Sequence, residues 1–142
     1  MEKNLIINIT IEDNSKKATE ESKETRSWSQ YAKFFDESSS HWTNYSEMNL
    51  MFLRQQEVYA TELLKKRGHL FLNEVYDMLG LPRSKVGQMV GWIYDPENPD
   101  HIGDNYVDFY LYDEKQRNFI NGYERTVLLD FNVDGMIIDK IS

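Results

Sequence analysis

Residues 46–67, SEMNLMFLRQQEVYATELLKKR, carry the strongest local signal in the chain and predict one long helix. Large apolar residues recur along it at helical spacing, at Met48, Phe52, Tyr59 and Leu63. Ser46 is a typical N-cap, and Glu47 follows in the first turn, where the helix dipole favours a negative charge. Basic residues occupy positions 65–67, and Gly68 supplies a left-handed stop. We therefore expect a helix over residues 46–67.

The chain after this helix predicts a short helical hairpin and then strands. A short helix is expected at 73–79, closed by Gly80, and Ser84 is placed to cap a second one that reaches about Val90. Alternating apolar and β-branched residues predict strands at 106–112, 126–131 and 136–141. Asp134-Gly135 is a strong turn signal between the last two. This order predicts an α+β fold with a C-terminal antiparallel sheet.

The chain before the helix begins with a predicted strand at residues 4–12, in which Leu5, Ile7, Ile9 and Ile11 share one face. Residues 13–27 are polar, and we interpret them as a flexible linker between this strand and the main body. The total of 142 residues is a common size for one domain. We therefore expect a single domain over residues 1–142.

Composition excludes several classes of protein. Twenty-four acidic against 16 basic residues give a formal charge of −8, which opposes direct binding to nucleic acids or anionic membranes. The absence of cysteine excludes disulfides, thiolate nucleophiles and sulfur-ligated zinc. No apolar run approaches the ~18 residues of a membrane span, and the N-terminus lacks the order of a signal peptide. These features predict a soluble protein of the cytoplasm.

The negative charge is concentrated near the C-terminus. Residues 93–142 hold 11 acidic and 4 basic residues, a balance of 4 − 11 = −7. In a strand at 106–112, Asp108 would share a face with three tyrosines, which suits an interface with Lys and Arg of a partner. An ordinary solvated sheet face is the alternative. The predicted partner-binding residues are Asp104, Asp108, Tyr110, Asp113 and Glu114.

Two segments offer oxygen ligands for a divalent cation, although we expect no cofactor. Asp130, Asn132 and Asp134 match the first half of a calcium-binding loop, but Ile141 stands where the bidentate Glu belongs. The loop at 95–104 also gathers carboxylates beside His101. A hairpin turn explains the first segment better, and solvated carboxylates explain the second.

The sequence argues against two further activities, DNA binding and catalysis. The stretch 72–90 predicts a short helix, a turn and a second short helix, as in a helix-turn-helix motif. The second helix offers only Arg83, Lys85 and Gln88 for contacts with DNA, so a structural hairpin is favoured. The histidines His41, His69 and His101 lie far apart in sequence and in no recognised catalytic motif. We therefore do not expect an enzyme.

Four segments resemble an uncharacterised domain family of phages and mobile elements in Gram-positive bacteria. They are 31–39 (YAKFFDESS), 67–77 (RGHLFLNEVYD), 103–109 (GDNYVDF) and 121–135 (NGYERTVLLDFNVDG), and the resemblance extends over about residues 31–139. It implies a phage or mobile-element origin and supplies no catalytic residues.

Small acidic phage proteins of this size are often inhibitors of host defence. An acidic protein can block the basic nucleic-acid channel of a CRISPR nuclease by imitating phosphate charge. We therefore expect an anti-CRISPR protein that acts on a nuclease in the host cytoplasm. The alternatives are a phage structural or assembly protein that binds another phage component, and a helix-turn-helix-like regulator. The sequence leaves the oligomeric state open.

Overall fold

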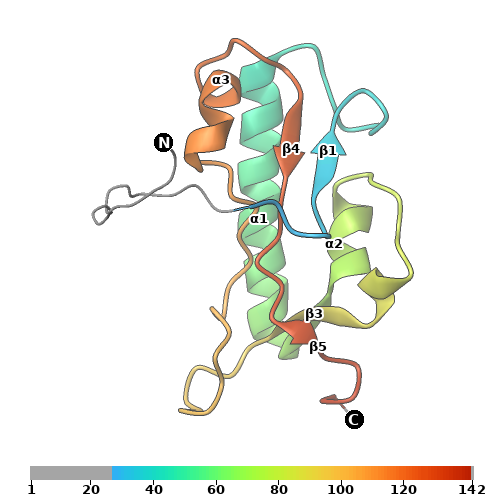
Figure 1. Cartoon of the computed structure of the whole chain (residues 1–142), viewed down its shortest axis with the longest axis vertical. Coiled ribbons are helices and arrows are strands. Elements are labelled where there is room, and N and C mark those ends of the chain that lie inside the picture. The colour runs from blue at the N-terminus through green and yellow to red at the C-terminus, as the bar shows by residue number, and fades with distance from the viewer. Residues whose placement is uncertain (1–26, 142) are drawn as a thin grey trace, which may run out of the picture.

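The computed structural model describes residues 27–141 (Figure 1). Its elements in chain order are β1 (Lys33–Phe35), α1 (Ser46–Arg67), β2 (His69–Phe71), α2 (Leu72–Met78), η1 (Val86–Gln88), β3 (Val90–Ile93), η2 (Glu114–Gln116), α3 (Arg117–Ile120), β4 (Val127–Leu129) and β5 (Gly135–Met136). The fold class is α+β, as predicted. The strand predicted at 4–12 and the linker up to residue 26 lie outside the described residues.

The long helix α1 has the bounds that the sequence predicts. Gly68 ends it with φ 87°, the left-handed conformation that glycine adopts without strain, and its N–H donates to Leu64 O over 2.7 Å. Tyr45 rather than Ser46 is the N-cap, since Ser46 already belongs to the first turn. Local signals along one continuous segment thus determine this element. Among residues 27–141, no helix is long and apolar enough to cross a membrane.

Two small antiparallel sheets replace the expected C-terminal sheet. β4 pairs with β1, and β5 is the edge strand of a sheet ordered β2-β3-β5. The strand predicted at 126–131 is shorter, at Val127–Leu129, and that predicted at 136–141 is wrong beyond Met136. Asp134-Gly135 is not a hairpin turn, because Gly135 pairs with Gly91 of β3. The late strands therefore complete sheets that earlier strands begin.

The predicted helical hairpin is only half formed. α2 occupies Leu72–Met78, but the second element, η1, is a single 3₁₀ turn at Val86–Gln88. Ser84 Oγ does accept a hydrogen bond from Gly87 N (3.0 Å), as expected of a cap, but β3 begins at Val90 and stops any further helix. Arg83 is paired with Asp77 at the end of α2. This geometry lacks a recognition helix, so the helix-turn-helix interpretation loses its structural basis.

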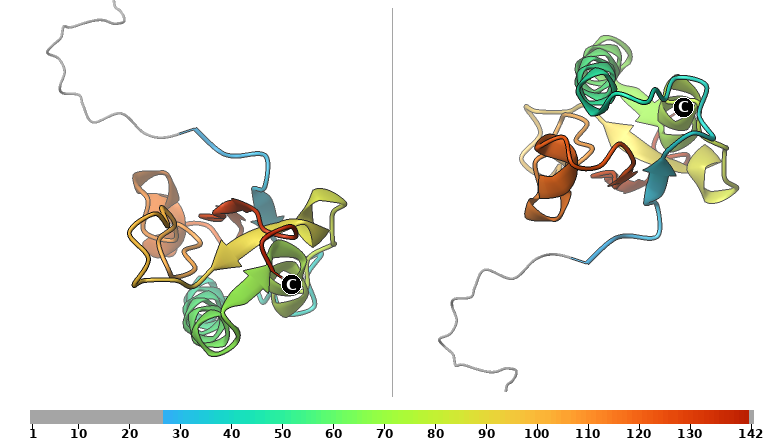
Figure 2. Two further views of the ribbon diagram at one scale, coloured as in Figure 1. Left: turned by 90° about the horizontal axis from the view of Figure 1, so that it is seen from below. Right: turned by 90° about the horizontal axis from the view of Figure 1, so that it is seen from above.

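The core lies between α1, α2 and the sheets. Phe131 packs edge-on against both Tyr76 and Phe109, with ring centroids 5.5 Å apart in each pair, and Trp92 is fully buried beside them. In Figure 2, α1 lies at the rim of the molecule, with one side against the sheets and the other turned outward. The core therefore covers only the inner side of this helix.

Candidate functional site

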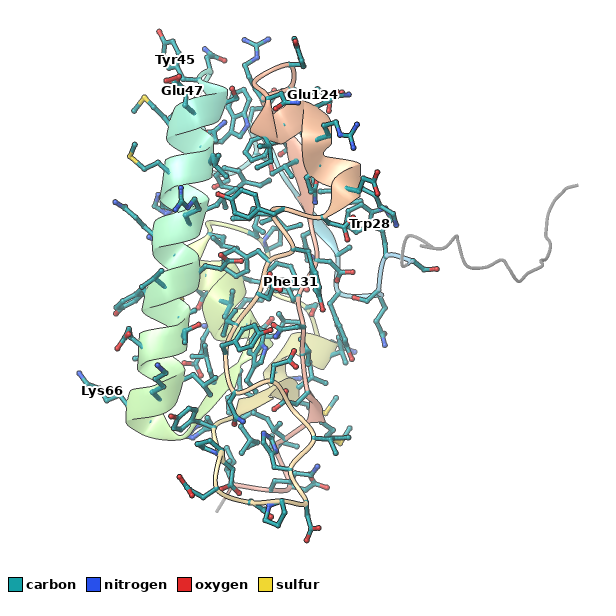
Figure 3. The ribbon with its side chains drawn as sticks, turned by 90° about the vertical axis from the view of Figure 1, so that its left-hand side faces the viewer. Trp28, Tyr45, Glu47, Lys66, Glu124 and Phe131 are labelled. Carbon is teal, nitrogen blue, oxygen red and sulfur yellow. The ribbon has the colours of Figure 1, made fainter. Side chains whose placement is uncertain are left out.

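The segment 106–112 runs beside α1 from the loop 95–104 toward α3 (Figures 1 and 3). Its apolar residues Val107, Phe109 and Leu111 are buried, as the alternating sequence predicts, whereas Tyr106 and Tyr112 are exposed. Within the described part of the chain, however, the segment forms no strand. Side-chain burial therefore alternates along residues 106–112 as it would in a strand, although the segment lacks the regular backbone hydrogen bonds that pair two strands.

Only two long backbone bonds, from Asp130 N to Phe109 O and from Asn132 N to Asp108 O (3.4 Å each), join this segment to a neighbouring one, and side chains replace the rest of the ladder. Four consecutive backbone N–H groups donate to side-chain oxygens: Val107 to Thr61 Oγ1 (3.0 Å), Asp108 to Asn132 Oδ1 (2.7 Å), Phe109 to Glu57 Oε2 (2.7 Å) and Tyr110 to Asp108 Oδ1 (2.8 Å). Buried backbone donors must find acceptors, and here α1 and residue 132 provide them. The course of this segment thus depends on a few polar side chains.

The amide of Asn132 makes four hydrogen bonds, one to β3 and three to residues 104–108. Its Oδ1 accepts from Trp92 Nε1 (2.9 Å) and from Asp108 N, and its Nδ2 donates to Asp104 Oδ2 (3.0 Å) and to Tyr106 O (2.9 Å). An asparagine amide can make about four hydrogen bonds, so this one is fully used. Asn132 therefore holds the side chain of Asp104 and the backbone of Asp108 near each other.

Glu57 holds the same segment from α1. Besides accepting from Phe109 N, its carboxyl group lies beside the carboxyl group of Asp108. Burial, and then the neighbouring charge of Asp108, raise the pKa of Glu57 to about 7, against the lowering effect of the Phe109 hydrogen bond and of Arg54. Glu57 therefore changes its protonation state near neutral pH, beside the carboxyl group of Asp108.

Of the five predicted partner-binding residues, Asp104 and Asp108 meet at Asn132, Tyr110 adjoins Asp108 through its backbone N–H, and Asp113 and Glu114 lie apart from them at η2. Asp104 and Asp108 both bind Asn132, and within residues 27–141 neither forms an ion pair with Lys or Arg. Tyr110 is half-buried, in a left-handed conformation with φ 60°. Asp113 caps η2 by accepting from Lys115 N (3.0 Å), and Glu114 pairs with Arg117 (3.2 Å).

The excess of negative charge occupies a shorter stretch than residues 93–142. Residues 115–142 contain four acidic and four basic residues, so their charges cancel. The whole excess of −7 lies in residues 93–114, which contain seven acidic residues and neither Lys nor Arg. We call residues 93–114 the acidic edge. The seven are Asp95, Glu97, Asp100, Asp104, Asp108, Asp113 and Glu114, of which Glu97, Asp100, Asp104 and Glu114 are exposed.

A hollow of about 430 Å³ lies between the loop 95–104 and the start of β5. Asp134 lines it, accepts from Ile93 N of β3 (2.8 Å), and presses against Gly103, where a side chain would collide with its carboxyl group. His101 Nε2 lies 3.8 Å from Asp134 Oδ2, and burial raises the pKa of Asp134. Asp134 thereby ties the acidic loop to the sheet.

The three candidate metal ligands do not share one centre. Both oxygens of Asp130 accept from Ser29, whose N lies at 2.7 Å and whose Oγ lies at 2.6 Å. Asn132 accepts a hydrogen bond from Trp92 Nε1, and Asp134 accepts one from Ile93 N. Among the described residues, no group of three His, Asp or Glu side chains is placed to hold a metal ion.

Sequence reasoning left Glu57, Glu97 and Asp100 out of the predicted partner-binding residues. Glu57 looks like an ordinary surface residue of an amphipathic helix, and only folding brings it to Phe109 and Asp108. Glu97 and Asp100 could have been found by counting charges in shorter windows, because no Lys or Arg occurs between residues 93 and 114.

Comparison with known proteins gives a family for the chain. No curated protein and no solved structure matches it. Residues 2–141 match the model described as a family of unknown function, DUF6353. This match includes the four segments 31–39, 67–77, 103–109 and 121–135 that suggested an uncharacterised family, and it reaches the N-terminal residues as well. The chain belongs to this family of unknown function.

Proposed function

We propose that this protein is a binding protein whose acidic edge docks on a basic surface of a partner protein. The observation that supports it best is the run of seven carboxylates without a Lys or Arg, whose backbone is held at Asp108 by Asn132 and at Phe109 by Glu57 of α1. Positive charges on a partner would relieve the repulsion among these carboxylates and speed association.

The way the acidic edge is held favours an interface over a solvated surface. Asn132 donates to the carboxylate of Asp104 and accepts from the backbone N–H of Asp108, so one amide orders both acidic residues. Glu57 adds a third carboxyl group beside them, although its burial is unfavourable for the charged form. Solvated acidic loops need no such anchors, whereas a surface that must match a partner benefits from being ordered before it binds.

In its most specific form, the proposal is a phage-encoded inhibitor of host defence that acts in the bacterial cytoplasm. The partner would be a CRISPR nuclease, and the acidic edge would occupy a basic channel that otherwise receives nucleic acid. The charge of the edge and the resemblance to phage and mobile-element proteins support this form. No cofactor and no catalytic step belong to it.

Charge reversal on the loop 95–104 tests the docking surface. Asp100→Lys combined with Asp104→Lys should weaken binding to the partner about tenfold, because two exposed carboxylates become repulsive. The partner is first captured from the host with the full chain as bait, and binding is then measured by calorimetry. For a captured nuclease, competition with its target DNA is measured in parallel.

The matched control is Glu37→Lys with Asp139→Lys, which changes the net charge equally at exposed positions outside the acidic edge. This control should bind like the unmodified protein at one salt concentration. Equal weakening by both pairs would show a non-specific charge effect and would refute the assigned surface. Capture of virion proteins without any nuclease would refute the anti-CRISPR form and favour an assembly protein.

A further inference from the structure

The outer side of α1 carries apolar side chains that no other part of residues 27–141 covers. Met48, Met51, Val58 and Tyr59 of this helix are each more than half exposed. The inner side, with Leu53, Ala60 and Leu64, is fully buried in the core. Figure 3 shows the outer side between Glu47 and Lys66 facing away from the rest of the molecule. A helix that is apolar on both sides normally has both sides in contact with protein.

The outer residues follow the spacing of a helix–helix seam. Exposed positions 48, 51, 55, 58 and 62 alternate steps of three and four, the repeat by which one helix packs along another. Met48, Met51 and Val58 supply apolar side chains at three of these positions. Methionine is flexible and adapts well to a facing surface. The surface therefore suits one partner helix rather than a small ligand.

The charges at the two ends of α1 favour a second copy of the same helix in the opposite direction. Glu47 lies in the first turn, and Lys65 and Lys66 lie in the last. Antiparallel pairing of two copies would place each Glu47 near Lys65 and Lys66 of the other copy, and would also oppose the two helix dipoles. Parallel pairing would bring like charges together at both ends.

We infer that this protein forms a homodimer in which two α1 helices pack antiparallel through their outer sides. The two-fold axis lies between Gln55 and Val58, so that Glu47 of one copy is opposite Lys65 and Lys66 of the other, and Met51 and Val58 of both copies lie within the seam. The inference goes beyond the proposed function and does not depend on it. The dimer would carry two acidic edges, so that each could engage a basic surface.

The oligomeric state of the full chain in solution tests the inference. Size-exclusion chromatography with light scattering should give twice the chain mass of 16.9 kDa as the concentration rises. Met51→Glu combined with Val58→Glu should raise the dimer dissociation constant about tenfold or more, because charges enter the apolar seam. Both positions are exposed in the monomer, so its circular dichroism should stay unchanged.

The matched control is Ile102→Glu, since Ile102 is almost fully exposed on the loop 95–104. This variant should dimerise normally. A chain that stays monomeric at all concentrations would overturn the inference, as would a dimer that resists the double change at Met51 and Val58.

Charge exchange tests the antiparallel direction. Glu47→Lys alone, and Lys65→Glu with Lys66→Glu, should each weaken the dimer, because each places like charges at both ends of the seam. The variant that carries all three changes should regain the original dissociation constant. Failure of this combination to recover dimerisation would exclude the antiparallel pairing.

Discussion

Replacement of Asn132 by alanine should lower the free energy of unfolding by about 3 kcal/mol, because four hydrogen bonds lose their common partner. The indole N–H of fully buried Trp92 would lose its acceptor, and so would the backbone N–H of Asp108. Unfolding in urea, followed by fluorescence and circular dichroism, measures the change.

Two variants make this result specific to the Asn132 amide. Asn118→Ala removes the same group from an exposed position in α3 and should change the free energy by less than about 0.5 kcal/mol. Asn132→Asp keeps an acceptor for Trp92 but loses the donor to Asp104 and adds a like charge beside it, so it should also destabilise. A change at Asn132 no larger than that at Asn118 would contradict the central role of this residue.

Replacement of Glu57 by glutamine should remove a pH dependence of stability. The pKa of Glu57 is raised from 4.5 to about 7 in the folded protein, so folding favours the protonated carboxyl. Its contribution to stability is fully present below pH 4.5 and is lost as the pH rises through 7. Glutamine cannot ionise, and its amide can still accept from Phe109 N and donate to Asp108.

The expected measurement is the difference in free energy of unfolding between the Glu57→Gln variant and the unmodified protein. Near pH 4.5 the difference should be small. It should grow in favour of the variant by about 2 kcal/mol up to pH 8, a value that allows for solvent screening of this partly exposed carboxyl. Glu57→Ala should destabilise throughout this range, because Phe109 N loses its acceptor. A difference that does not vary with pH would show that folding does not raise the pKa of Glu57.

Local signals made α1 predictable, whereas the strands depended on distant contacts. The bounds of α1 follow from helical spacing, the charged end turns and Gly68, all within one continuous stretch. Residues 106–112 alternate in burial as a strand would, and sequence alone cannot distinguish this from true strand pairing. The acceptors that replace a neighbouring strand are Glu57, Thr61 and Asn132, which lie far from the segment in sequence.

The negative charge of the candidate site was predictable from the sequence, but the contacts that hold its residues in place were not. Counting charges identified Asp104 and Asp108, and folding does bring them together at Asn132. Asn132 itself had been assigned to a possible cation site because its spacing from Asp130 and Asp134 resembles half of a calcium loop. In the structure Asn132 instead accepts a hydrogen bond from Trp92, and no local sequence pattern connects these two positions.

The side-chain anchoring of residues 107–110 has a consequence for motion. A paired strand must break a full ladder of backbone bonds before it can move, but this segment is held by two long backbone bonds, from Asp130 N and Asn132 N (3.4 Å each), and by separate side-chain contacts to Thr61, Asn132 and Glu57. It can therefore detach from α1 in a local opening while both sheets stay intact. Its amide protons should exchange with deuterium sooner than those of β3, and a bound partner should slow that exchange.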